Sequence, residues 1–375
     1  MKKESRPLPK GKYAVGTFTY TVDSERSEVL DPSTKRHVAC RVYYPVTKES
    51  VAGMDKVQYM SRGMVKGIKS SFKVPLNYDK LTASGENVSE AYENAPRIPG
   101  EKFPLIVFSH GYQSFREGNS YLLIELASQG YVVISVAHSK EGILTEFDDG
   151  STLPPLKGLA TKTYQPFLGG VIGALKLANY KGTNREIADK FDQFQDKYCN
   201  FMQGRILVWK EDTLEAVDYA RKNLADLIDF DKGIGASGHS FGGDLAYLLC
   251  ASEPDYVCGI NIDGGLFGDY KNAVMDKPFM QISCRGNETI VARAYLRHTK
   301  PVYKVLFRDM RHVGFSDMKF QISIKSLVGT LDSNLCHDYT CASHLEFFDA
   351  YLKCSKSFAL QSNDAITVTT FEPDM

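Results

Sequence analysis

One stretch constrains the fold of this chain more than any other. Residues 234–249 contain Gly238-His239-Ser240-Phe241-Gly242, a G-x-S-x-G motif. Small and apolar residues precede the motif, as at the end of a buried strand, and leucines follow it at helical spacing. A serine on so sharp a turn between strand and helix projects its hydroxyl outward from a strained backbone. The motif therefore predicts that Ser240 is a nucleophile, although the same pattern also occurs by chance in ordinary turns.

The segments around this turn predict an α/β fold. Short, continuous apolar runs are typical of strands buried on both faces. Two such runs flank a helical segment that ends at Gly130, and this order indicates a parallel strand–helix–strand unit. The parallel strands are predicted at 104–111, 132–137, 234–239, 257–262, 279–284 and 303–307, with amphipathic helices at 214–224 and 342–352.

The N-terminal part predicts an antiparallel edge of the sheet. Residues 13–22 and 38–45 are rich in β-branched and aromatic residues, and turn-forming residues lie between them. We expect one domain over residues 11–355, with insertions at about 46–102 and 139–204 and loose termini at 1–10 and 356–375. The first insertion is expected over one face of the sheet, with short helices at 54–61 and 81–84. In the second, residues 167–177 form either a mobile flap over the site or a helix packed on the sheet.

Composition excludes several classes of protein. Lysine and arginine number 45, as do aspartate and glutamate, so the net charge is zero and a general nucleic-acid binder is not expected. The first ten residues lack the apolar core of a secretory signal, and no apolar run is long enough for a membrane helix. We expect a cytoplasmic protein, although a trimmed secreted chain would look the same.

The cysteines do not suggest a metal site. The eight cysteines include no C-x-x-C pair, so neither a zinc knuckle nor a thioredoxin-type site is predicted. Cys336 and Cys341 are close enough in sequence to pair in an oxidising compartment, but reduced thiols are favoured. We predict neither a metal nor a cofactor.

A nucleophilic serine needs a histidine as general base and a carboxylate that orients the histidine. In an α/β-hydrolase sheet these follow in the order serine, acid, histidine, each after a strand. His312 comes shortly after the strand at 303–307, where the base is expected. His239 adjoins Ser240, so its side chain is expected to point elsewhere, and His110 is expected to support a loop. The remaining histidines, His37, His138, His298, His337 and His344, lie in less suitable positions.

Asp263, directly after the strand at 257–262, is the preferred acid. Asp309 is the rival, but it ends the strand that leads to His312 and lies too close in sequence to reach round to Nδ1. Asp269 and Asp276 are weaker rivals. The oxyanion is expected to bind two backbone N–H groups, those of Phe241 and of Tyr112.

These motifs together resemble the platelet-activating factor acetylhydrolase family, the plasma and intracellular type II enzymes also called group VII phospholipases A2. The resemblance rests on Val-Phe-Ser-His-Gly at 107–111, Gly-His-Ser-Phe-Gly-Gly at 238–243, Gly-Ile-Asn-Ile-Asp at 259–263 and the histidine after the strand at 303–307. It implies an α/β-hydrolase fold and Ser240, Asp263 and His312 as the catalytic triad. It also implies a calcium-independent serine esterase that releases short or oxidised sn-2 acyl groups, a 1-alkyl-2-acetylglycerophosphocholine esterase.

The resemblance determines the reaction type more firmly than the substrate. After Asp263 the chain has Gly264-Gly265-Leu266 where the family often has bulky aromatic residues, and residues 139–141 also depart from the usual pattern. The expected partners are a phospholipid or small ester substrate and, transiently, a membrane surface. The alternatives are a broad carboxylesterase or dienelactone-type hydrolase, and a non-catalytic binding protein with a hydrolase fold.

Overall fold

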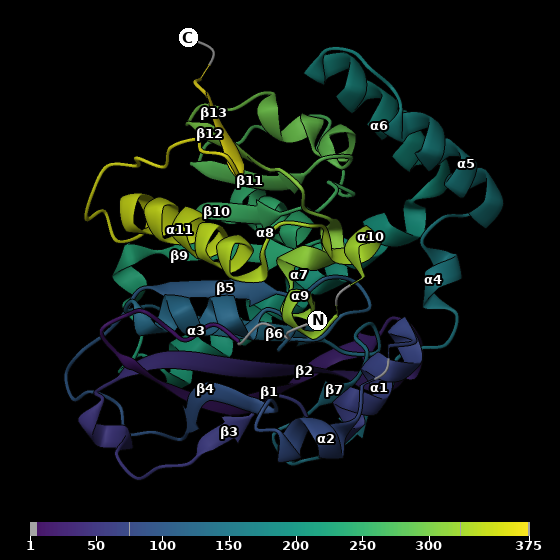
Figure 1. Cartoon of the computed structure of the whole chain (residues 1–375). Coiled ribbons are helices and arrows are strands. Elements are labelled where there is room, and N and C mark those ends of the chain that lie inside the picture. Colours follow the sequence, from purple (N-terminus) through teal and green to yellow (C-terminus); the bar gives the residue numbers. More distant parts are fainter. Residues whose placement is uncertain (1–5, 75, 323, 374–375) are drawn as a thin grey trace.

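A large sheet runs through the whole molecule (Figure 1). The computed structural model describes residues 6–74, 76–322 and 324–373. Within these residues the sheet has 11 strands, and those from β12 to β6 in the spatial order are parallel. That order is β13 (Ile366–Phe371), β12 (Val302–Phe307), β11 (Phe279–Cys284), β10 (Tyr256–Ile262), β9 (Ile234–His239), β5 (Leu105–Ser109), β6 (Val132–His138), β2 (Asp31–Val46), β1 (Ala14–Glu28), β4 (Val88–Glu93) and β3 (Lys56–Gln58).

The N-terminal hairpin forms the predicted antiparallel edge. β1 and β2 pair from Ala14 with Val46 to Glu28 with Asp31, and β2 continues antiparallel onto β6. Both strands are longer than expected because their polar ends, which carry no apolar pattern, still pair with each other. The predicted α/β class is confirmed, with a mostly parallel sheet and an antiparallel edge.

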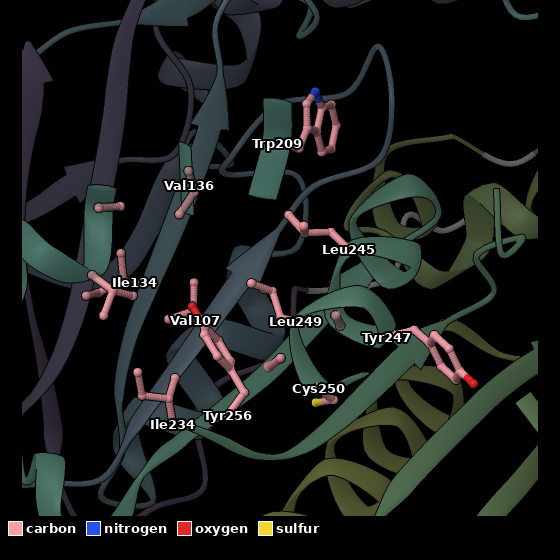
Figure 2. Packing of buried hydrophobic residues seen from close by; sticks show 14 of the residues in the cluster. Val107, Ile134, Val136, Trp209, Ile234, Leu245, Tyr247, Leu249, Cys250 and Tyr256 are labelled. Carbon is pink, nitrogen blue, oxygen red and sulfur yellow. The ribbon is translucent and has the colours of Figure 1, made fainter. Parts of the chain in front are cut away.

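Helices cover both faces of the sheet, as predicted. Neighbouring residues of a strand point to opposite faces, so Val107 and Ile106 belong to two different cores. On one face Trp209, Leu245 and Leu249 belong to the same cluster of buried side chains as Val107 and Ile134 (Figure 2). The helices on this face are α7 (Asn200–Asn223) and α8 (Phe241–Ser252). Those on the other face are α3 (Ser120–Ser128) and α11 (Ser333–Tyr351).

The first insertion differs from the prediction. Instead of lying over one face, it extends the sheet, because β4 pairs in parallel with β1 through Gly16 and Tyr92 and β3 pairs with β4. The helix expected at 54–61 is wrong, since this segment holds β3. The helix α1 (Arg62–Phe72) begins only after Ser61, whose hydroxyl accepts a hydrogen bond from the amide of Met64. A short helix follows near the expected place, α2 (Tyr78–Ala83).

The C-terminal segment is not loose. Residues 366–371 form β13, which pairs antiparallel with β12 from Val302 with Phe371 to Phe307 with Ile366. The strand at 303–307 is therefore not the last one of the sheet, and the structured part extends beyond residue 355. At the other end, residues 6–10 have no helix or strand, but the amide of Lys10 donates to Glu125 Oε2 at 2.7 Å. Residues 1–5 lie outside the described part of the chain.

The second insertion carries helices that project from the body of the molecule. α5 (Phe167–Ala178) packs along α6 (Asn184–Tyr198), where Gly173 allows a close approach to the Phe194 ring (Figure 1). Thus α5 is not a helix packed on the sheet; its mobility as a flap stays a prediction. None of the described helices combines the length and apolarity needed to cross a bilayer. The other short elements are β7 (Thr145–Glu146), β8 (Thr152–Leu153), α4 (Leu159–Lys162), α9 (Met318–Gln321), α10 (Lys325–Val328), η1 (Glu49–Val51), η2 (Phe230–Lys232), η3 (Glu288–Ile290), η4 (Ala292–Tyr295) and η5 (His312–Phe315).

Candidate active site

Ser240 lies on the sharp turn between β9 and α8. Its backbone has φ 56° and ψ −122°, a conformation that is strained for any residue with a side chain. The flanking glycines make this turn possible, because a Cβ on Gly238 would lie 2.1 Å from the Gly242 carbonyl oxygen. A Cβ on Gly242 would in turn meet the Ser109 carbonyl of β5 at 2.0 Å. The motif therefore produces the predicted strand–turn–helix geometry.

The structure brings the predicted base and acid to this serine. His312 opens η5, and its Nε2 lies 2.9 Å from Ser240 Oγ. Its Nδ1 lies 2.8 Å from Asp263 Oδ2 at the end of β10. The Asp263 side chain is fully buried, whereas that of His312 is 40% exposed. A hydroxyl, an imidazole and a carboxylate are thus in line, which is the arrangement required for activating a serine nucleophile.

The rival carboxylates lie elsewhere. Asp309 is exposed, and its backbone carbonyl accepts hydrogen bonds from the amides of Thr330 and Leu331. Asp269 and Asp276 are also exposed. Of these aspartates, Asp263 is the one whose carboxylate meets the imidazole, because it follows a strand that neighbours β9 in the sheet.

The two predicted oxyanion donors lie next to Ser240. The Phe241 amide is the first of α8, where helical N–H groups have no partner within the helix. Tyr112 lies on the loop after β5, and a Cβ on Gly111 of this loop would be 3.0 Å from Ser240 Cβ. The Tyr112 and Phe241 rings pack edge to face, with centroids 5.7 Å apart. Both amides are therefore available on the segments that adjoin the serine.

A small cavity opens above these residues. It has a volume of about 110 Å³. Ser240, His312 and Tyr112 form its polar side, while Phe115, Val313 and Met318 supply apolar walls. The cavity therefore offers a small, mainly apolar space beside the serine hydroxyl.

His239 contributes to the site in a way that the sequence did not predict. Its ring lies beside the His312 ring, with centroids 4.8 Å apart, and its Nε2 donates to the His312 backbone carbonyl at 3.0 Å. Burial, followed by the proximity of His312, lowers the pKa of His239 to about 3, so the ring stays neutral. His239 thus fixes the loop that carries His312. Only its place beside Ser240 in the motif could have pointed to it.

A buried polar network supports the loop that carries Tyr112. The His110 Nδ1 contacts the Gly111 carbonyl at 2.7 Å, as expected for a residue that supports this loop. The Glu141 backbone carbonyl accepts a hydrogen bond from the Gln113 amide at 2.9 Å. The buried Glu141 carboxylate accepts another from Arg205 Nε at 2.8 Å. Burial raises the pKa of Glu141 although Arg205 opposes it. Sequence reasoning missed this network because its members lie far apart along the chain.

Among the residues that the structure describes, no group of three or more histidine, cysteine, aspartate or glutamate side chains is arranged to hold a metal ion. The eight cysteines are free thiols, including Cys336 and Cys341, and seven of them are buried.

Comparison with known proteins supports the resemblance seen in the motifs. A family model described as "Platelet-activating factor acetylhydrolase, isoform II" matches residues 1–149. The platelet-activating factor acetylhydrolase of Cavia porcellus is 26% identical over 380 residues, which cover 94% of this chain and 79% of that protein. The chain is related to the platelet-activating factor acetylhydrolase family. The enzyme of that name from Canis lupus familiaris is 25% identical, with 95% of this chain and 79% of that protein covered.

Two more distant proteins extend the comparison. A probable 1-alkyl-2-acetylglycerophosphocholine esterase of Arthroderma benhamiae is 22% identical, with 74% of this chain and 66% of that protein covered. The solved structure of a ferulic acid esterase from Streptomyces cinnamoneus superposes with a TM-score of 0.76 at 20% identity, covering 99% of this chain and all of that one. This structure shows that the fold is shared. Because the family model ends before Ser240, the assignment of the reacting residues depends on the geometry of the site.

Proposed function

We propose that this chain is a serine esterase that hydrolyses the short or oxidised sn-2 acyl ester of phospholipids like platelet-activating factor. Its activity would be that of a 1-alkyl-2-acetylglycerophosphocholine esterase. The observation that carries this proposal is the line of hydrogen bonds from Ser240 Oγ through His312 to Asp263. The names of the curated relatives support the substrate class.

The reaction would proceed through an acyl-enzyme. His312 Nε2 takes the Ser240 proton as Oγ attacks the ester carbonyl, and Asp263 stabilises the imidazolium that forms. The oxyanion of the tetrahedral intermediate binds the Phe241 and Tyr112 amides. His312 then gives its proton to the leaving alcohol, and a water molecule activated by the same ring releases the acid. The chain's own residues supply each of these steps, so we propose a reaction without a metal or cofactor.

The cavity predicts a preference for short acyl groups. In a series of phosphocholines with sn-2 chains of increasing length, kcat/KM should be highest for acetyl and fall as unoxidised chains lengthen, because the apolar walls enclose only about 110 Å³. The same series as p-nitrophenyl esters is the control for intrinsic reactivity. Equal turnover of phosphocholine and nitrophenyl acetyl esters, without preference for the lipid, would favour the broad carboxylesterase or dienelactone-type alternative.

We also propose that the enzyme contacts a membrane surface transiently, through α5. Four apolar side chains of this projecting helix are exposed, which is unusual for residues of this kind in a folded chain. Leu168 is 71% exposed and Leu175 is 63% exposed, and Phe167 and Ile172 are each 47% exposed. Helices of this type bind in the interface of a bilayer by burying their apolar face. Contact here would bring the protein to its lipid substrate.

The double substitution Leu168→Glu and Leu175→Glu is expected to weaken co-sedimentation with phosphatidylcholine vesicles by at least about tenfold, since two apolar side chains become charged. Turnover of soluble p-nitrophenyl acetate should not change. Leu335→Glu on α11, where the side chain is 47% exposed, is the matched control. Unchanged vesicle binding in the α5 variant would refute this contact.

The free thiols are compatible with the cytoplasmic setting that we propose.

A further inference from the structure

The carboxylate of Asp263 has more partners than the histidine. Its Oδ1 accepts from the backbone amide of Cys284 at 2.8 Å. Its Oδ2 accepts from Asn287 Nδ2 at 2.7 Å and from the Cys284 thiol at 3.3 Å, in addition to His312 Nδ1 at 2.8 Å. Cys284 and Asn287 therefore supply three hydrogen bonds to the acid besides the one from His312.

The sheet and one turn bring these donors into place. β10 and β11 are parallel neighbours, so the end of β11 at Cys284 lies beside the end of β10, where Asp263 follows. The chain then turns back, and the Asn287 amide bonds to the Cys284 carbonyl at 3.4 Å. Gly286 has φ 104°, which residues with a side chain rarely adopt. Glycine suits this position of a turn because it adopts such a positive φ without strain. The turn directs the Asn287 side chain at the carboxylate.

The hydrogen-bond donors that Cys284 and Asn287 present to Asp263 are neutral groups. A buried carboxylate must be compensated, either by a cation or by hydrogen bonds. Among the described residues, His312 is the one basic side chain within ion-pair distance of Asp263. Burial and then the nearby Asp263 raise the pKa of the Cys284 thiol, so it stays protonated and donates. Neutral donors stabilise the carboxylate but leave its negative charge to act on the imidazolium.

Asn287 also contacts the base. Its Nδ2 lies 3.5 Å from His312 Nδ1, at the edge of hydrogen-bonding distance, while it donates to Asp263 Oδ2. It is half-buried and does not line the cavity above Ser240. Its position therefore fixes which carboxylate oxygen meets the ring, without contact with a substrate in that cavity.

We propose that Asn287, with Cys284 as the second donor, is a positioning residue for the ester hydrolysis. This inference depends on the proposed function. The two side chains hold Asp263 Oδ2 in line with His312 Nδ1, and their hydrogen bonds moderate the pull of the carboxylate on the Nδ1 proton. His312 is thereby held with Nε2 facing the Ser240 hydroxyl.

The test compares Asn287→Ala with the wild-type chain on p-nitrophenyl acetate. Loss of one donor to a charged group should lower kcat by about 10- to 100-fold. KM should stay unchanged, because Asn287 lies outside the cavity. The acid limb of the pH–rate profile should move to higher pH, since a carboxylate with fewer donors holds the proton of His312 more tightly. His239 and Cys284 do not titrate near neutral pH, and Arg311, whose charge acts on the Cys284 thiol, is the same in both chains.

Cysteine variants separate positioning from packing. Cys284→Ser keeps a donor and should retain more activity than Cys284→Ala, which keeps only the backbone amide. Cys258→Ala, on the buried β10 strand, removes a core thiol of the same size and should lower stability without moving the pH profile. Asn223→Ala, at the exposed end of α7, is the control for the asparagine substitution.

An NMR titration of His312 makes the outcome independent of turnover. A higher titration midpoint in Asn287→Ala than in the wild type is the expected result. An unchanged midpoint and an unchanged kcat would overturn this inference, even if the wild-type chain is an active esterase. A wild-type chain that cleaves no ester, with a shifted midpoint in the variant, would instead overturn the proposed function and leave the positioning of His312 supported.

Discussion

Replacement of Ser240 with alanine is expected to abolish ester turnover, with a fall in kcat of at least about 10⁴-fold. The Ser240 hydroxyl is the group that His312 Nε2 reaches at 2.9 Å, so the variant has no nucleophile at this position. The free energy of unfolding should change by less than about 1 kcal/mol, because no core packing or buried ion pair is lost. Turnover of p-nitrophenyl acetate and thermal unfolding followed by circular dichroism measure the two effects.

A serine at the far end of the same helix provides the control. Ser252 is in α8, and its hydroxyl donates to the Leu248 carbonyl at 2.9 Å, away from the triad geometry. Ser252→Ala should keep wild-type turnover. If Ser240→Ala kept its activity while folded, the nucleophile would be another residue and the proposed mechanism would be wrong.

Replacement of Asp263 with asparagine should lower kcat by about 10⁴-fold, because asparagine has nearly the same size but carries no charge. The asparagine oxygen can still accept from the Cys284 amide, as Asp263 Oδ1 does. Its NH₂ group would then face the three groups that now donate to Oδ2: Asn287 Nδ2, the Cys284 thiol and His312 Nδ1. His312 would have to accept a hydrogen bond at Nδ1 and carry its own proton on Nε2. A protonated Nε2 cannot take the proton of Ser240. The expected loss is in kcat, measured at the pH optimum.

Asp309→Asn is a closely matched comparison. Asp263 and Asp309 both have φ 56°, and asparagine tolerates this backbone conformation well, so neither substitution adds backbone strain. Because the Asp309 side chain is exposed, its variant should keep activity within about twofold. A severe loss in Asp309→Asn with a mild one in Asp263→Asn would transfer the role of the acid to Asp309.

The sequence was sufficient for the parallel part of the sheet because those strands are buried on both faces. Such strands appear as short, mainly apolar runs, and the strands β5, β6, β10 and β11 have this form, whereas β9 was predicted from the small residues before Ser240. Chain order alone then places Ser240, Asp263 and His312 at the carboxyl ends of strands. Their mutual distances, by contrast, come only from the structure.

The sheet edges were predicted less well, because edge strands are paired on one side and partly exposed. β13 alternates Ile366, Val368 and then polar residues, a pattern that a loose tail can also show. β3 has three residues, too few for any periodicity. The contacts that orient the site were beyond prediction for another reason. Glu141 and Arg205 are 64 residues apart, and Asn287 reaches Asp263 only through a turn after a different strand.

The most direct test of the central claim is covalent labelling with a fluorophosphonate, followed by mass spectrometry of the peptides. A fluorophosphonate reacts only with a serine whose hydroxyl is activated by a neighbouring base. The account predicts one adduct per chain on Ser240, strongly reduced in His312→Ala and absent in Ser240→Ala. A folded wild-type chain that stays unlabelled, or that carries the adduct on a different residue, would contradict it.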